Sequence, residues 1–107
     1  MSEKKQFGVW IDSHQAVIVG REEITSGPFK ILAHENADAD HSKLFKQITA
    51  HMTNAQEVHV TGTGDYQEQF INYLAGTPQF KNTSAKESTS NKMSDEKLLE
   101  FINSKFN

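Results

Sequence analysis

The segment "VHVTGTGDYQEQF", residues 58–70, decides the fold that the sequence predicts. It begins with β-branched residues, passes through a Gly-Thr-Gly turn and continues with aromatic residues four apart, Tyr66 and Phe70. A strand, a glycine turn and a helix in this order are typical of an α/β protein. Asp65 and Glu68 have the spacing of a capping box, which predicts that the helix begins at the turn. We therefore expect a buried strand over residues 57–61 followed directly by a helix.

Three short segments upstream predict an antiparallel meander. Residues 6–12 alternate so that Phe7 and Trp10 face opposite sides of a strand. Residues 16–20 are a β-branched run, and residues 29–34 form a third strand after a Gly-Pro turn. We expect the third strand to lie at an edge of the sheet, where it could pair with a second copy of the chain and form a homodimer.

Helical spacing of apolar residues predicts a helix over about 40–53, with Asp38 or Asp40 as its N-cap. The helix after residue 65 should end at Gly76, in the left-handed conformation, because Thr77-Pro78 cannot continue it. The apolar positions that define the first helix are Leu44, Phe45, Ile48 and Met52.

The C-terminal part predicts a fifth strand and a third helix. Residues 83–89 are polar with several threonines, which is consistent with a peripheral strand. Residues 93–106 predict a helix with Ser94 as its N-cap and Met93 packed on Leu98. The order is β-β-β-α-β-α-β-α, so we expect a single α/β domain, residues 1–107, with a mixed five-stranded sheet flanked by helices in the ribonuclease-H-like order.

Composition narrows the function classes. The formal net charge is −3, from 14 acidic and 11 basic residues, and the basic residues include only one arginine, Arg21. Weak or absent nucleic-acid binding is the expectation, because that affinity comes from clustered Lys and Arg. The chain has no cysteine and no apolar run long enough for a signal peptide or a membrane span. We therefore expect a cytoplasmic protein with no membrane partner.

Three stretches resemble a group of small bacterial proteins: "FGVWIDSHQAVIVGRE", "EVHVTGTGDYQEQFINYLAG" and "NKMSDEKLLEFINSKF". That group is similar to the middle domain of archaeal and eukaryotic class-1 peptide-chain release factors and of Pelota-type ribosome-rescue factors. The matching positions are Gly8 to Asp12, Ala16 to Ile18, Gly62 to Gly64 and Lys92 to Asp95. The resemblance implies that the chain has the ribonuclease-H-like fold of this middle domain, a translational machinery component. It also implies that its partner is the ribosome or a translation-related protein.

One departure from the family limits what the resemblance implies. Release factors carry a Gly-Gly-Gln tripeptide between the third strand and the first helix. The corresponding segment here, "HENADADHSK" at residues 34–43, has no glycine and no glutamine and is acidic. We therefore expect a non-enzymatic, translation-factor-like domain that binds a protein or ribosomal partner, lacks peptidyl-tRNA hydrolysis activity, and uses no cofactor and no catalytic residue.

The alternative is a ligand- or anion-binding protein, or a small enzyme, that uses the crevice at the carboxyl ends of the first and fourth strands. Amide groups at the start of the second helix could hold an anion. A Walker loop would need a lysine after the turn, and a dinucleotide fingerprint would need a third glycine where Gln67 stands. A structural corner is therefore the competing interpretation. The candidate ligand-binding residues are Asp12, Thr61, Gly62, Thr63, Gly64 and Asp65.

Metal sites find little support in the sequence. Asp12 and Asp65 could supply two carboxylates of a magnesium-dependent nuclease, but the apolar face of the first helix offers no third. Asp12 at a hairpin end is more typical of a turn residue. His34 and His41 flank the acidic loop with Asp38 and Asp40, and these residues could form a surface zinc or nickel site only with strict geometry. No metal site is expected.

His59 stands out because it lies between two valines on the strand expected to be the most buried. A buried imidazole must find a hydrogen-bond partner. The sequence favours a satisfied core or crevice histidine, while a role as a catalytic base would need a nucleophile about 3 Å away.

Overall fold

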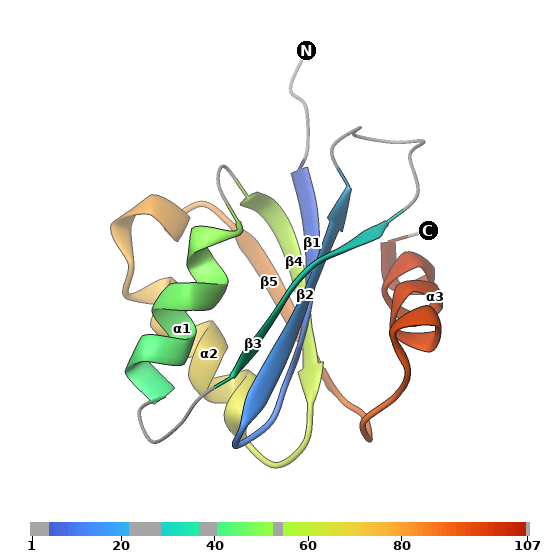
Figure 1. Ribbon diagram of the computed structural model, residues 1–107. Helices are drawn as coiled ribbons and strands as arrows, with labels where there is room; N and C mark the ends of the chain where they lie inside the picture. Colours follow the sequence, from blue (N-terminus) through green and yellow to red (C-terminus); the bar gives the residue numbers. More distant parts are fainter. Residues whose placement is uncertain (1–4, 22–28, 37–40, 53–54, 107) are drawn as a thin grey trace.

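The computed structural model describes residues 5–21, 29–36, 41–52 and 55–106. Figure 1 shows a β-sheet with helices on both faces. The strands are β1 (Lys5–Ile11), β2 (Gln15–Arg21), β3 (Lys30–Asn36), β4 (Ala55–Gly62) and β5 (Ser84–Thr89). The helices are α1 (His41–Ala50), α2 (Tyr66–Ala75), the 3₁₀ helix η1 (Pro78–Phe80) and α3 (Asp95–Phe106). This is the element order that the sequence predicts.

The sheet is mixed, with the order β3-β2-β1-β4-β5. β1 pairs antiparallel with β2, and β2 pairs antiparallel with β3. β4 runs parallel to β1 on one side and to β5 on the other. The predicted mixed five-stranded α/β fold is thus confirmed, and β3 lies at an edge as expected.

Residues that alternate along the strands divide the core between two faces. On one face, Phe7, Val9 and Ile11 pack with residues of α1 and α2. On the other, Trp10 packs with residues of α3. Figure 1 shows α1 and α2 on one side of the sheet and α3 on the opposite side. We call these the two-helix face and the one-helix face. The predicted opposition of Phe7 and Trp10 is confirmed.

Several element ends lie outside the predicted bounds. β4 exceeds the predicted residues 57–61, because it is paired with a strand on each side and the ladder continues past the apolar run. β3 continues to Asn36 because Gln15 and Ala16 of β2 still pair with it. α1 covers His41–Ala50, and the predicted caps Asp38 and Asp40 lie outside the described residues.

The two predicted ends of α2 need correction. Asp65 occupies the N-cap position but makes no side-chain capping bond; its Oδ1 accepts a hydrogen bond from Gln69 Nε2 at 3.1 Å, so there is no capping box with Glu68. Gly76 is not left-handed: its φ is −88° and its ψ 0°. The helix ends because Thr77 adopts an extended conformation before Pro78, which opens η1.

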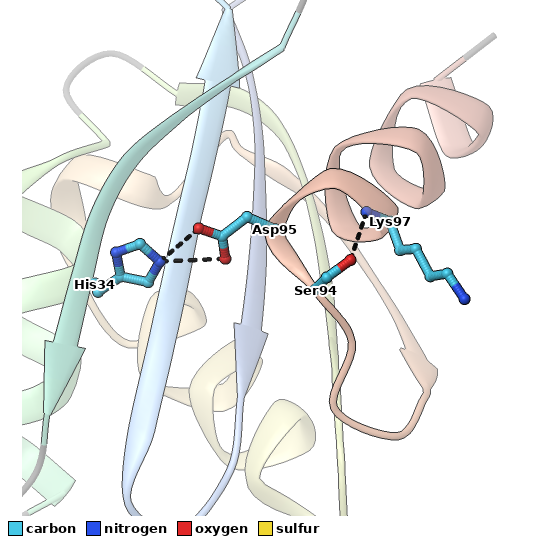
Figure 2. A network of polar contacts seen from close by, with 4 residues as sticks. All are labelled: His34, Ser94, Asp95 and Lys97. Carbon is cyan, nitrogen blue, oxygen red and sulfur yellow. Dashed lines mark hydrogen bonds and ion pairs between the residues drawn. The ribbon is translucent and has the colours of Figure 1, made fainter.

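The N-terminus of α3 has the predicted cap. Ser94 Oγ accepts a hydrogen bond from the backbone N–H of Lys97 at 3.3 Å, and the Ser94 carbonyl accepts one from Leu98. Figure 2 shows Asp95, beside Ser94, turned toward His34 of β3. Across the described part of the chain, the helices lack the combination of length and apolar character that a membrane crossing needs.

Candidate functional site

The β4–α2 corner brings the predicted ligand-binding residues to the end of β1. Gly62 is the register partner of Ile11, and the Thr63 N–H donates a hydrogen bond to the Ile11 carbonyl at 3.3 Å. A Cβ at Gly62 would lie 1.9 Å from that carbonyl oxygen, so no residue other than glycine fits between the two strands. The close approach of two backbones therefore explains Gly62.

Gly64 supplies the change of direction at this corner. Its φ is +68°, which is the left-handed region where a side chain would be strained. Among the described glycines, Gly64 is the one with a positive φ. The two glycines are thus needed for different reasons: Gly62 allows β4 to pack closely against β1, and Gly64 allows the turn.

Asp12 is engaged in its own hairpin. Its Oδ1 accepts hydrogen bonds from the backbone N–H groups of His14 at 2.7 Å and Gln15 at 2.8 Å. The Asp12 N–H in turn donates to the Gln15 carbonyl at 3.0 Å. These are the bonds of the predicted turn residue. A ligand role for Asp12, Thr61 and the Gly62–Asp65 turn stays a prediction.

A second polar cluster, which the sequence does not reveal, lies on the one-helix face between β4 and β5. His59 Nε2 is 2.8 Å from Ser88 Oγ. Ser88 Oγ donates to Thr61 Oγ1 at 3.0 Å, and Thr61 Oγ1 is 2.7 Å from Ser90 Oγ. We call these four residues, His59, Thr61, Ser88 and Ser90, the hydroxyl network.

The network is built by strand register. His59 pairs with Lys86 and Thr61 with Ser88 in the parallel β4–β5 ladder, so alternate residues of both strands share one face. His59 and Thr61 are buried, whereas Ser88 and Ser90 are half-buried. His59 therefore has the partner that its burial requires, as expected. Residues 86–90 are all polar, so no alternation in the sequence indicates which of them face His59.

The surroundings of His59 keep its ring neutral. Burial, and then the positive charges of Lys105 and Lys86, lower the pKa of His59 from its usual value of 6.5. The Phe101 ring of α3 lies edge-on to the imidazole, with ring centroids 6.0 Å apart. Lys105 Nζ lies 5.0 Å from the centroid of the same Phe101 ring. A neutral imidazole, an aromatic ring and two ammonium groups therefore gather at this end of the network.

Of the two histidines considered for a metal site, only His34 has a described side chain. His34 Nε2 lies 3.0 Å from Asp95 Oδ2, an exposed contact that joins β3 to α3 (Figure 2). The side chain of His41 and the acidic loop before it lie outside the described residues. Within the ranges that are described, no group of three or more His, Asp or Glu side chains could hold a metal ion.

No protein-family model matches the sequence. No curated protein matches it either. Solved structures do match its fold. Pelota from Archaeoglobus fulgidus matches with a TM-score of 0.72 at 13% identity, over 97% of this chain and 32% of Pelota. Pelota from Thermoplasma acidophilum matches with a TM-score of 0.69 at 18% identity, over 94% of this chain and 32% of the other. An archaeal translation termination factor, aRF1, matches with a TM-score of 0.57 at 11% identity, over 92% and 33%.

The chain has the fold of a domain of Pelota and release-factor proteins. It spans about a third of the length of those structures. The predicted similarity to release-factor and Pelota domains is therefore confirmed. At identities of 11–18%, the similarity concerns the fold.

Proposed function

We propose that this chain is a non-enzymatic, translation-factor-like domain that binds the ribosome or a translation-related protein in the cytoplasm. The observation that carries the proposal is the match to Pelota over 97% of the chain with a TM-score of 0.72. Nearly all of the sequence is used to build the domain shared with Pelota. We infer that this chain and Pelota share a role in contacts within the translation machinery. The ribonuclease-H-like relationship predicted from the element order belongs to the same proposal.

The proposal does not include peptidyl-tRNA hydrolysis. Residues 34–43, where the resemblance would place the Gly-Gly-Gln tripeptide, contain neither glycine nor glutamine. A hydrolysis assay with peptidyl-tRNA on purified ribosomes should show no peptide release above the rate without protein. Release that depends on this chain would contradict the non-enzymatic assignment.

Ribosome co-sedimentation tests the partner. The tagged chain should pellet with ribosomes through a sucrose cushion at low salt, and a tagged protein of similar size and charge should not. A net charge of −3 argues against binding through ribosomal RNA alone, so the bound fraction should fall only modestly as salt is raised. Absence from every ribosomal fraction at low salt would overturn the proposal.

The open edge of the sheet favours self-association as a second property. Among the described residues, β3 has a hydrogen-bonded neighbour on only one side, and its Leu32 is 41% exposed. We infer a homodimer that pairs two β3 strands across this edge. Light scattering after gel filtration should give twice the chain mass, and Leu32→Lys should give the monomer. A monomeric wild type at high concentration would exclude this dimer.

A further inference from the structure

Three basic side chains converge beside the hydroxyl network, and they come from three different elements. His59 lies on β4, and Lys86 is its register partner on β5. Lys105 reaches the same place from α3, because its Nζ lies over the Phe101 ring and that ring packs edge-on to His59. Both lysines are exposed, and Phe101 is half-buried. The group therefore lies where solvent and a small solute can reach it.

The hydrogen bonds of Ser88 indicate which ring nitrogen of His59 carries the proton. A hydroxyl group has one proton, and Ser88 donates its proton to Thr61. Ser88 can then only accept from His59, so Nε2 carries the ring proton and Nδ1 keeps its lone pair. Burial and the two nearby lysines lower the pKa of His59 and favour the neutral ring, whereas the Ser88 hydrogen bond is compatible with both forms, so the ring can take up a proton at Nδ1.

Among the described residues, no carboxylate forms an ion pair with Lys86, Lys105 or His59. Glu57 is two residues before His59 on the same face of β4, but it accepts a hydrogen bond from Gln6 Nε2 at 3.0 Å. Gln6 in turn accepts from Arg21 Nε at 2.9 Å, so Glu57 belongs to a separate network. Glu87 follows Lys86 and, by the alternation of a strand, points to the opposite face. The two ammonium groups therefore act together on His59, which is consistent with the lowered pKa of its ring.

We propose that Lys86, Lys105 and His59 form a binding site for a phosphate group, with Phe101 as its apolar wall. A phosphate has three or more acceptor oxygens and up to two negative charges near neutral pH, which suits donors arriving from three directions. A bound dianion also favours the charged imidazole, so binding adds a third positive charge at Nδ1. This site is separate from the β4–α2 corner and independent of the proposed ribosomal partner.

NMR titration of the full chain with inorganic phosphate tests the site. Amide signals of Lys86, Ser88 and Phe101 should shift and saturate, and sodium chloride at matched ionic strength should not reproduce the shifts. The pKa of His59, followed through its ring nitrogens, should rise when phosphate is present. Acetate, with one charge and two oxygens, should bind more weakly than phosphate.

Variants locate the binding groups. Lys86→Gln and Lys105→Gln should each weaken phosphate binding about tenfold, the order expected for one charge-assisted hydrogen bond. Lys97→Gln is the matched control, because it removes the same charge from the exposed surface of the first turn of α3. All three positions are exposed, so the variants should fold, which unchanged amide spectra elsewhere would verify.

A third titration with adenosine monophosphate separates the sources of the phosphate group. Tighter binding with new shifts at Phe101 would assign the site to a nucleotide, whose base stacks on that ring, whereas equal affinity would assign it to free phosphate. Either result supports the proposal. Shifts that do not saturate, or that chloride reproduces, would overturn it, and so would equal weakening by Lys97→Gln.

Discussion

The two faces of the sheet use alternate residues of the same strands but are built differently. On the two-helix face, Phe45 of α1 packs on Phe70 and Tyr73 of α2, with ring centroids 5.4 and 5.3 Å away, so each helix is supported by the sheet and by the other helix. On the one-helix face, α3 is the helix of the described chain that covers the sheet (Figure 1). Its core residues there are Leu98 and Ile102.

Both faces contain buried polar groups, and they satisfy them to different extents. An unpaired buried polar atom is costly, and among the described residues there is one on each side, Gln67 Oε1 of α2 and Trp10 Nε1 of β1. Beside a single helix, His59 and Thr61 are buried only because neighbouring hydroxyl groups on β5 satisfy them. We infer that the two-helix face supplies most of the stability and the one-helix face is the place for binding.

The largest effect should come from an aromatic residue on the two-helix face. Phe70 is fully buried, and Phe70→Ala should lower the free energy of unfolding by about 3–5 kcal/mol because it removes the ring and leaves a cavity. Phe101→Ala on the other face is the matched control, and its half-buried ring should cost about half as much or less. Urea denaturation measures both, and equal losses would contradict the comparison.

Two isoleucines of equal burial test how firmly α1 and α3 are held by the elements around them. Ile48 of α1 and Ile102 of α3 are both 0% exposed, so replacement of either by alanine should cost about 2–5 kcal/mol. Hydrogen exchange should separate them. Ile102→Ala should speed exchange of α3 amides far more than those of the sheet, since none of the other described helices lies on the same face as α3. Uniform acceleration in both variants would show that α3 is not a separate unit.

Exchanging a methyl and a hydroxyl group between adjacent β4 positions probes the polarity of each face. Val60→Thr places a hydroxyl group in the apolar core and should cost about 1–3 kcal/mol. Thr61→Val keeps the shape but breaks the hydroxyl network, and should cost about 1 kcal/mol because Ser88 and Ser90 are half-buried and can turn to water. Thermal denaturation of both variants measures which of them loses more stability. A larger loss in Thr61→Val than in Val60→Thr would contradict the assignment of faces.

The smallest effect should be a pH dependence from His59. Its pKa is lowered in the folded chain, so below pH 6.5 the unfolded chain binds more protons and stability falls as pH decreases. The loss begins near pH 6.5 and continues toward the lowered folded value. His59→Gln should flatten the stability profile in that range. An unchanged profile in urea denaturation at several pH values would show that His59 does not contribute.

Much of the fold is predictable because its signals are local. Alternation in residues 6–12 places Phe7 and Trp10 on opposite faces, and Ser94 marks the start of α3 one residue ahead. The errors at Asp65 and Gly76 are local too, since other bonds and a following proline gave each helix end a different geometry. Helix ends have several solutions of similar energy, so residue type alone does not select one.

The candidate sites also have features that the sequence indicates and features that only the tertiary structure shows. The sequence alone indicates that a Gly-Thr-Gly turn joins β4 to α2 and that His59 needs a partner. Only the tertiary structure shows that Gly62 packs against the Ile11 carbonyl, and that Ser88, Lys86 and Lys105 surround His59. The physical reason is strand register: a slip of one residue between β4 and β5 would turn these side chains to the opposite face, and no local pattern fixes that register.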